Sequence, residues 1–294
     1  MYHAQSSRRC VTLSMDQMPT SSQALFELEL KVIEDNQPIV DLIAANCSFS
    51  RSKIKQMMKQ GEVWLQPNKV QSRNKTERRI RRAKTNLTAG DVVCVYHNET
   101  VYLTPPPEPT LIVDEGIYSV WSKPAGLMSS GTRFGDHCAI NRWVEQHLAP
   151  QRDVHLIHRL DRFASGLIVL AHTKSAAADL SKQFRDRTVS KCYRVIVEGL
   201  VTEPLRIDSE LDGKPSISQL APTSVNQDTQ QTTLEVTIET GRKHQIRRHL
   251  AGIGHPVLGD RQYGSGQGEL ALRSIKLAFD HPDTDDRMVY VLDV

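Results

Sequence analysis

The chain lacks the features that mark membrane, secreted and disulfide-bonded proteins. Even apolar runs such as residues 167–171 fall far short of the ~20 consecutive residues that a membrane-spanning helix needs. Arg8 and Arg9 are not followed by an apolar stretch of the length found in a secretory signal. The five cysteines are scattered and form no C-x-x-C pair, which argues against a disulfide framework or a zinc knuckle. We therefore expect a soluble protein of the reducing cytoplasm, without a membrane partner.

A strong net charge is also missing, but the charge is unevenly distributed. The formal net charge is only +3, and the 39% hydrophobic content is ordinary for a folded protein. Residues 1–103 hold 15 Lys and Arg against 10 Asp and Glu, whereas residues 104–294 hold 22 against 24. The basic excess therefore lies in the smaller, N-terminal part, where it could hold a polyanion.

Residues 104–110, T-P-P-P-E-P-T, form the clearest boundary in the chain. Consecutive prolines lack N–H donors and favour a stiff, extended spacer. Dividing the chain there predicts four parts: a polar tail at 1–24, a small basic domain at 25–103, the linker at 104–110 and a larger domain at 111–294.

The small domain is expected to contain short helices at 39–45 and 52–60 and a strand at 62–65. Ser50 or Ser52 could cap the second helix, which Gly61 could end. Four basic side chains would lie on or beside this helix: Arg51, Lys53, Lys55 and Lys59. Residues 69–84 add eight basic side chains against one acid. Such a run is equally typical of a solvated or disordered surface.

The order of these features favours an RNA-binding surface over a merely solvated one. Residues 50–65 read S-R-S-K-I-K-Q-M-M-K-Q-G-E-V-W-L, a basic helix followed by glycine and a short strand. This order resembles the small RNA-binding module named after ribosomal protein S-four, and the resemblance covers roughly residues 25–103. It implies that the four basic side chains of the second helix contact RNA.

The larger domain mixes short β-rich segments with helical ones. Strands are expected at residues 117–121, 167–171, 193–198, 234–239 and 275–279. Helices are expected at residues 174–187 and 243–251. Connections of mixed length favour an α+β domain with a largely antiparallel, mixed sheet over regular βαβ winding.

One short pattern in this domain could bind a metal. His155, His158 and Asp161 fall at H-x-x-H-x-x-D spacing, and both residue types are competent ligands. The intervening apolar residues make the stretch equally typical of a strand, and short motif matches are often accidental. A metal-dependent nuclease or phosphoesterase is therefore the weaker alternative, and chelators would inactivate it.

The same aspartate belongs to a more informative string. Residues 158–171 read H-R-L-D-R-F-A-S-G-L-I-V-L-A, so Asp161 precedes a buried strand that could hold a loop carboxylate rigidly. An isolated Asp is more often a turn or cap residue. The string resembles, however, the H-R-L-D-x-x-T-S-G motif of the RluA-type pseudouridine synthases, whose Asp is catalytic; Ala164 replaces the usual Thr.

Further matches occur in family order across residues 111–282. They are K-P-A-G-L at 123–127, K-C-Y at 191–193, T-G-R-K-H-Q-I-R-R-H-L at 240–250, G-H-P-V-L-G-D at 254–260 and Y-G at 263–264. Any one of them is weak, but their number and order make a chance resemblance improbable.

The resemblance implies an isomerase that breaks the base–sugar bond of a uridine at nitrogen and remakes it at carbon 5. Nothing is oxidised, added or lost, so no cofactor and no metal are expected. Asp161, ordinarily ionised at neutral pH, would act at the sugar or base as a nucleophile or electrostatic partner. In the family an Arg pairs with this Asp and a Tyr packs on the target base; the matching residues are Arg247 and Tyr193. His244 belongs to the same motif, and a role in proton transfer stays open.

The resemblance also implies structured RNA as the partner. The target uridine must be flipped out or lie in a loop, and Arg159 could fill the vacated stack. Arg242, Lys243 and Arg248 are expected to grip phosphates. The S-four-like module favours large-subunit ribosomal RNA over transfer RNA, and no obligate protein partner is implied. The alternatives are pseudouridylation of transfer RNA and a non-catalytic RNA-binding protein.

Overall fold

The computed structural model describes residues 25–68 and 77–293, and the chain forms two compact units. The division falls between Leu103 and Thr104, at the start of the proline-rich segment. The expected tail at 1–24 and residues 69–76 of the basic stretch lie outside the described residues. Within the described residues, no helix has the length and apolar character that crossing a membrane requires.

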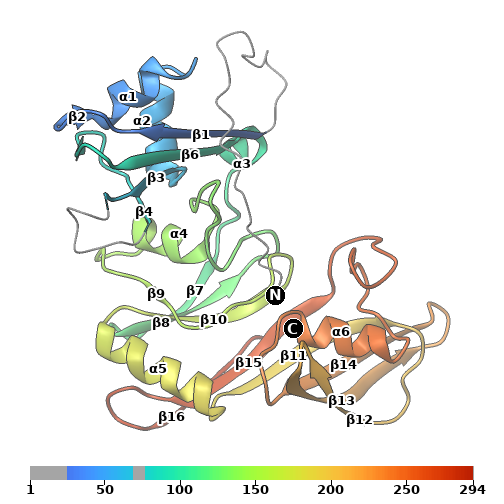
Figure 1. Ribbon diagram of the computed structural model, residues 1–294. Coiled ribbons are helices and arrows are strands. Elements are labelled where there is room, and N and C mark those ends of the chain that lie inside the picture. Colours follow the sequence, from blue (N-terminus) through green and yellow to red (C-terminus); the bar gives the residue numbers. More distant parts are fainter. Residues whose placement is uncertain (1–24, 69–76, 294) are drawn as a thin grey trace, which may run out of the picture. The chain divides into compact units, whose positions relative to one another are not determined.

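The described part of the N-terminal unit combines three short helices with a four-stranded antiparallel sheet of order β1-β6-β3-β4 (Figure 1). Its elements are β1 Leu25–Lys31, β2 Gln37–Pro38, α1 Ile39–Ala45, α2 Arg51–Gln60, β3 Val63–Gln66, β4 Arg78–Arg79, β5 Asn86–Leu87, β6 Val92–Asn98 and α3 Glu99–Leu103. The apolar sides of α1, α2, β3 and β6 share one hydrophobic core.

Helix α2 shows why the sequence folds as expected here. The Ser50 hydroxyl accepts a hydrogen bond from the Lys53 amide at 3.2 Å, which satisfies one of the unpaired donors of the first turn. Gly61 ends the helix at φ +81°, a left-handed conformation that glycine adopts without steric cost. Ile54, Met57 and Met58 are buried on one side, so the basic residues are confined to the other.

The C-terminal unit is built on a ten-stranded sheet. Its elements are β7 Thr110–Asp114, β8 Tyr118–Lys123, α4 Ile140–His147, β9 His155–Leu156, β10 Ser165–Ala171, α5 Lys174–Asp186, β11 Ser190–Glu198, β12 Leu205–Leu211, β13 Lys214–Asn226, β14 Gln231–Ile238, α6 Gln245–Gly252, β15 Leu272–Asp280 and β16 Arg287–Val291. The main strand order is β12-β13-β14-β11-β15-β10-β8-β7; β16 pairs with β15, and β9 with β10. Among the strand pairs described for this sheet, only that of β10 with β15 is parallel, which confirms the expected α+β fold with a largely antiparallel sheet.

Strand β10 is apolar from Leu167 to Ala171 because both of its faces are covered. Leu167 and Val169 pack in the cluster that includes Leu180 of α5, whereas Ile168 and Leu170 pack in the cluster that includes α4. Side chains alternate between the faces of a strand, so a run with no polar residue is expected only where both faces are buried. The strand that follows Asp161 is therefore fixed by a core on each side.

Most expected elements agree with the structure to within a few residues, but helix α6 begins later than predicted. The prediction placed its start at Lys243, and the helix starts at Gln245. His244 has φ +53°, a left-handed conformation that interrupts helical backbone. His244 is therefore the residue that precedes the helix, and its side chain belongs to the site described next.

Candidate active site

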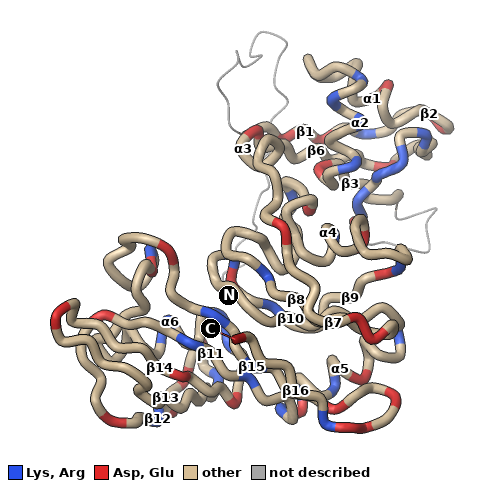
Figure 2. The backbone as a smooth tube through the Cα atoms, turned by 180° about the vertical axis from the view of Figure 1, so that it is seen from behind, with Lys and Arg blue, Asp and Glu red and all other residues tan. Residues whose placement is uncertain are grey.

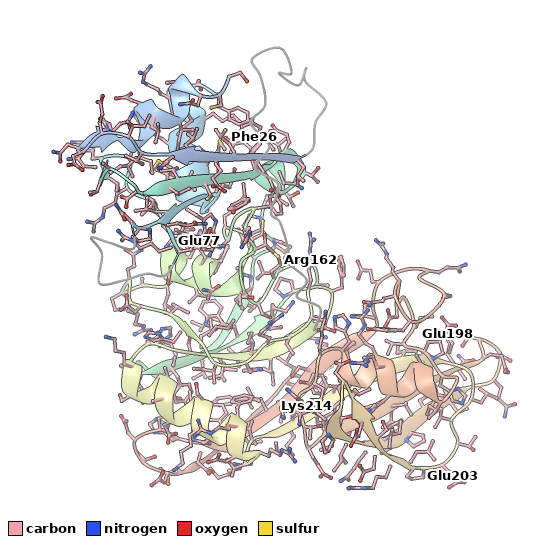
Figure 3. All side chains as sticks on the ribbon, viewed as in Figure 1. Phe26, Glu77, Arg162, Glu198, Glu203 and Lys214 are labelled. Atoms are coloured by element: carbon pink, nitrogen blue, oxygen red, sulfur yellow. The ribbon has the colours of Figure 1, made fainter. Side chains whose placement is uncertain are left out.

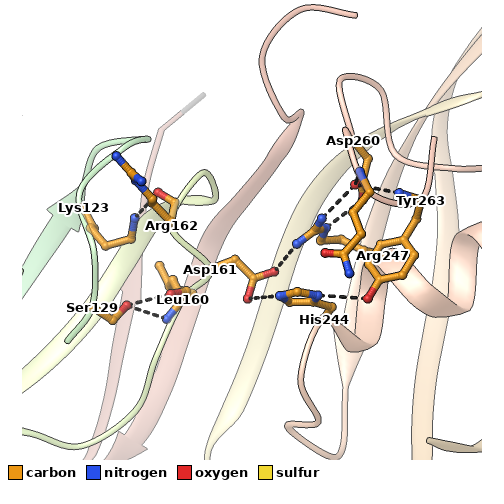
Figure 4. A network of polar contacts seen from close by, with 10 residues as sticks. Lys123, Ser129, Leu160, Asp161, Arg162, His244, Arg247, Asp260 and Tyr263 are labelled. Carbon is orange, nitrogen blue, oxygen red and sulfur yellow. Dashed lines mark hydrogen bonds and ion pairs between the residues drawn. The ribbon is translucent and has the colours of Figure 1, made fainter. Parts of the chain in front are cut away.

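The loop that bears Asp161 is fastened to the loop of the K-P-A-G-L motif (Figure 4). The Ser129 hydroxyl donates to the Leu160 carbonyl at 2.7 Å and accepts from the Leu160 amide at 2.9 Å. The buried Nζ of Lys123 donates to the carbonyls of Pro124, Leu127 and Arg162, at 3.0, 2.8 and 3.3 Å, and burial lowers the pKa of Lys123 to about 7. The residues on both sides of Asp161 are therefore held by hydrogen bonds.

Two residues behind the loop fix its approach to the sheet. Gly166, at φ +103°, pairs with Ser274 of β15, and a Cβ atom there would lie 2.1 Å from the Ser274 carbonyl oxygen. Only glycine allows this approach. His158 accepts a hydrogen bond from the Val169 amide through Nε2 at 3.1 Å and stacks on Phe184. Burial lowers the pKa of His158 to about 3, so this imidazole is neutral.

Arg247 of α6 connects two carboxylates. Its Nε and Nη2 donate to both oxygens of Asp260, at 2.7 and 2.8 Å, and its Nη1 donates to Asp161 Oδ2 at 3.1 Å. Asp260 is fully buried, whereas the Asp161 side chain is 27% exposed. The bidentate pair fixes the plane of the guanidinium. Asp260 therefore aims Arg247, and Arg247 presents one N–H to the accessible carboxylate.

Asp260 also accepts hydrogen bonds from the protein backbone. Its Oδ1 accepts hydrogen bonds from the backbone amides of Gln262 and Tyr263, at 2.9 and 3.1 Å. Burial alone would raise the pKa of Asp260, but the hydrogen bonds from Arg247 and these amides lower it below its usual value. The charge of Arg247 is thus balanced before any substrate is bound.

His244 approaches the other carboxylate oxygen of Asp161 (Figure 4). Its Nε2 is 3.8 Å from Asp161 Oδ1, and its Nδ1 forms a 3.0 Å hydrogen bond with the Tyr263 hydroxyl. Burial lowers the pKa of His244 below its usual value, against the opposite effect of Asp161. A neutral imidazole beside a carboxylate could accept or pass on a proton.

Tyr193 of β11 is buried in the same region and lines one cleft with Asp161. Burial, and then the negative charge of Asp161, raises the pKa of Tyr193 far above its usual range. Its hydroxyl is therefore protonated at neutral pH. A flat, neutral ring at this position suits contact with a base.

Asp161 lies where two clefts meet. One cleft, of about 670 Å³, is lined by Arg159, Asp161, Tyr193, Arg242, Lys243 and Arg247 among others. The second, of about 880 Å³, shares Arg159, Asp161, His244 and Arg247 with the first and extends along residues 128–132. The structure therefore brings together six of the candidate residues predicted from the sequence.

The other predicted basic residues lie elsewhere. Arg248 points from α6 to Asp212, with hydrogen bonds of 2.8 and 3.1 Å, and does not line either cleft. Lys55 and Lys59 are exposed on α2 of the N-terminal unit, where Arg51 pairs with Asp41.

Lys53 differs from the other basic residues of α2, because its ammonium is engaged inside the N-terminal unit. It donates to Glu99 at 2.8 Å and lies 4.8 and 5.0 Å from the ring centres of Phe49 and Tyr102. Its charge is therefore partly balanced by the protein itself.

The residues of the alternative metal site do not converge. His158 is occupied by Val169 and Phe184, Asp161 by Arg247, and His155 belongs to strand β9. Among residues 25–68 and 77–293, no three His, Cys, Asp or Glu side chains are grouped so that they could hold a metal ion.

Sequence reasoning missed the parts played by Asp260, Tyr263 and Lys123. All three belong to strings that matched the family, but the strings do not say which side chain meets which. Asp260 precedes a turn and would ordinarily be interpreted as a turn residue. Its role could have been predicted only from its full burial, and the burial of such a residue is decided by the tertiary fold.

Comparison with known proteins supports one family. The family model of RNA pseudouridylate synthase matches residues 117–252. The chain is 31% identical over 303 residues to an uncharacterized RNA pseudouridine synthase of Aquifex aeolicus, covering 90% of this chain and 93% of that protein. It is 34% identical over 212 residues to the dual-specificity RNA pseudouridine synthase RluA of Escherichia coli K12, covering 63% of this chain and 94% of RluA.

Solved structures agree at the level of the fold. Human RNA pseudouridylate synthase domain containing 1 is matched with a TM-score of 0.55 and 20% identity, over 65% of this chain and 86% of that one. Human RNA pseudouridylate synthase domain containing 4 gives a TM-score of 0.53 and 22% identity, over 63% and 88%. With its motifs, its sheet and these relatives, the chain belongs to the RluA-type RNA pseudouridine synthases, isomerases that convert uridine in RNA to pseudouridine.

Proposed function

We propose that Asp161 is the catalytic residue of this isomerase and that Arg247 and Tyr193 support it. The main support is the contact of Asp161 Oδ2 with Arg247 Nη1 at 3.1 Å, at the point where two clefts meet. A carboxylate paired with a fixed guanidinium keeps its charge and its direction, while its partial exposure leaves it open to substrate.

The reaction leaves the atoms of the nucleotide unchanged in number. The bond between ribose carbon 1 and the base nitrogen breaks, and a bond from the same ribose carbon to base carbon 5 forms. The hydrogen on carbon 5 then leaves, and the nitrogen gains a proton. Asp161 acts at the sugar or base during this exchange. Tyr193 packs on the base, and neutral His244 is near enough to Asp161 to take part in the proton movement.

The basic residues around the first cleft would bind the RNA backbone. Arg242 and Lys243 line this cleft beside Asp161, and Arg159 is shared by both clefts. We propose Arg242 and Lys243 as phosphate contacts, Arg159 as the side chain that fills the stack of the flipped uridine, and Arg248 as a more peripheral phosphate contact. Arg248 would have to exchange its partner Asp212 for phosphate.

The N-terminal unit is proposed as an S-four-like module that captures structured RNA, with large-subunit ribosomal RNA favoured over transfer RNA. Exposed Arg51, Lys55 and Lys59 extend from one helix, and Figure 2 shows the basic residues of this unit in blue. Each lost phosphate contact should weaken binding and reduce the slope of log affinity against log salt by about 1. Replacing Lys55 and Lys59 together by alanine tests this; Lys53→Ala should instead lower stability, because Glu99 loses one of its two partners and keeps only His97.

A carbodiimide map of pseudouridine across total cellular RNA tests both activity and substrate. Cells with the normal protein, with none, with Asp161→Asn and with Asp228→Asn are compared; Asp228 is an exposed acid outside both clefts. A site lost without the protein and in Asp161→Asn, but kept in Asp228→Asn, is the expected result. Full modification by Asp161→Asn would refute the catalytic assignment. A site found in transfer RNA alone would refute the preference for ribosomal RNA.

A further inference from the structure

Phe163 is the one exposed aromatic side chain among the described residues, with 48% of its surface accessible. Large apolar side chains at a surface are common singly, but an aromatic ring beside a nucleic-acid site has a specific use, because every base has a face that can stack on it. Phe163 lines the second cleft and follows Asp161 by two residues. Its Cα therefore lies no more than about 7.6 Å from that of Asp161, two trans peptide steps away.

Two arginines accompany this ring. The guanidinium carbon of Arg162 lies 5.3 Å from the ring centre, and that of Arg261 lies 6.0 Å from it. Both side chains are exposed, and both line the same cleft. Arg162 lies on the loop before β10, where Figure 3 labels it, and its Nε donates to the Gly126 carbonyl at 3.3 Å. Guanidinium planes, like aromatic rings, stack on unpaired bases, and their charge also suits phosphate.

The ring and the arginines are attached to the elements that hold the Asp161–Arg247 pair. Phe163 and Arg162 belong to the Asp161 loop, and Arg261 directly follows Asp260. The Arg261 loop is held by the Gln262 amide, which donates to Asp260. A group bound on this surface is therefore kept in register with the carboxylate.

We propose that Phe163, with Arg162 and Arg261, is a stacking platform for the base of a nucleotide next to the uridine that is modified. The proposal rests on Asp161 as the catalytic residue, since Asp161 fixes where that uridine lies. The second cleft has four arginines on its lining against Asp161 and Glu269, which suits an anionic RNA strand and not a basic partner. The platform makes Phe163 a determinant of which sequence context is accepted.

Binding is measured first, in an Asp161→Asn background, so that turnover does not affect the result. The probe is an RNA hairpin that carries the uridine identified by the pseudouridine map, with 2-aminopurine at the nucleotide before or after it. Phe163→Ala should weaken binding by about 5- to 150-fold, the worth of one base–aromatic stack. Phe163→Tyr should keep the affinity, and Phe163→Leu should lose it, because leucine keeps apolar bulk without a π-face.

Two further measurements identify a stack. The 2-aminopurine fluorescence should be quenched on binding at one flanking position only, and Phe163→Ala should remove that quenching. When this nucleotide is made abasic, Phe163→Ala should have no additional effect on affinity. Leu205→Ala, an exposed apolar residue outside both clefts, is the matched control and should bind as the parent does.

The outcomes separate this proposal from the assignment of Asp161. Turnover retained by Asp161→Asn refutes the catalytic assignment, whereas the binding data still report on Phe163. Equal affinity of Phe163→Ala and the parent at every flanking position would overturn the platform and leave a protein partner as the reason for the exposed ring. Parental affinity of Phe163→Leu would also overturn it, because apolar packing alone would then suffice.

Discussion

Asp161 and Asp260 bind the same arginine, yet replacing each of them should have a different consequence. Asp260 is fully buried and accepts two hydrogen bonds from Arg247 and two from backbone amides. Asp161 is 27% exposed and accepts one hydrogen bond from Arg247 at 3.1 Å. We therefore predict that Asp260→Asn mainly destabilises the C-terminal unit and that Asp161→Asn mainly abolishes turnover.

The magnitudes follow from burial. Removing one partner of a buried charge pair costs about 3–5 kcal/mol, because the other charge stays buried without its counterion. In a domain of this size, each kcal/mol lowers the melting temperature by about 2–4 °C, so Asp260→Asn should lower it by about 6–20 °C. A partly exposed pair is worth about 0–1 kcal/mol, which predicts a change of no more than about 4 °C for Asp161→Asn.

Calorimetry of the full chain, with hydrogen exchange at the amides of α6, measures the stability of the unit that contains Arg247. Release of tritium from carbon 5 of labelled uridine measures turnover, because that hydrogen leaves in the reaction. Asp260→Asn should retain some turnover at a temperature at which it is folded. If Asp260→Asn melts as the parent does and Asp161→Asn is the less stable of the two, then Asp260 does not fix Arg247 and the reasoning is refuted.

Three other perturbations test the fold around the site and in the N-terminal unit. Gly166→Ala should lower stability by several kcal/mol, because its Cβ would meet the Ser274 carbonyl at 2.1 Å; an unchanged melting temperature would contradict this close approach. Lys123→Met should lower the tritium-release rate more than RNA affinity, since three carbonyls lose the donor that holds the Asp161 loop; a purely affinity-related loss would argue against this role. Burial would lower the pKa of His97, but its hydrogen bonds to two glutamates raise that pKa above its usual value. The N-terminal unit should therefore lose stability as pH rises from about 6.5, the usual pKa of histidine, through the raised pKa of His97 in the folded protein. His97→Gln should flatten this dependence in hydrogen exchange of the β6 amides, and an unaltered pH profile would exclude His97 as its source.

Local chemistry in the sequence was enough for several elements. Helix α2 has a serine cap and a terminal glycine, and strand β10 contains the uninterrupted apolar run Leu167–Ala171. These signals depend on neighbours within a few residues, so they can be recognised in the sequence. The order of the family motifs likewise identified Asp161 and Arg247 as residues to examine together, although 86 positions separate them.

Contacts between distant segments could not be read in the same way. Helix α6 begins at Gln245 and not at Lys243, because His244 takes a left-handed backbone that places its ring near Asp161. Lys53 was expected to contact RNA like its neighbours, and only the structure shows that its ammonium also donates to Glu99, 46 residues away. A basic residue on a helix has the same local sequence whether its partner is a phosphate or a carboxylate.

The sequence by itself determined the family, the sheet-based fold and the carboxylate to consider first, because motifs and periodicity are properties of the chain alone. Tertiary structure decided the burial of Asp260, the direction of Arg247 and the exposure of Phe163. Burial and ion pairing depend on which surfaces the folded chain brings together. Those surfaces exist only after the strands and loops have packed.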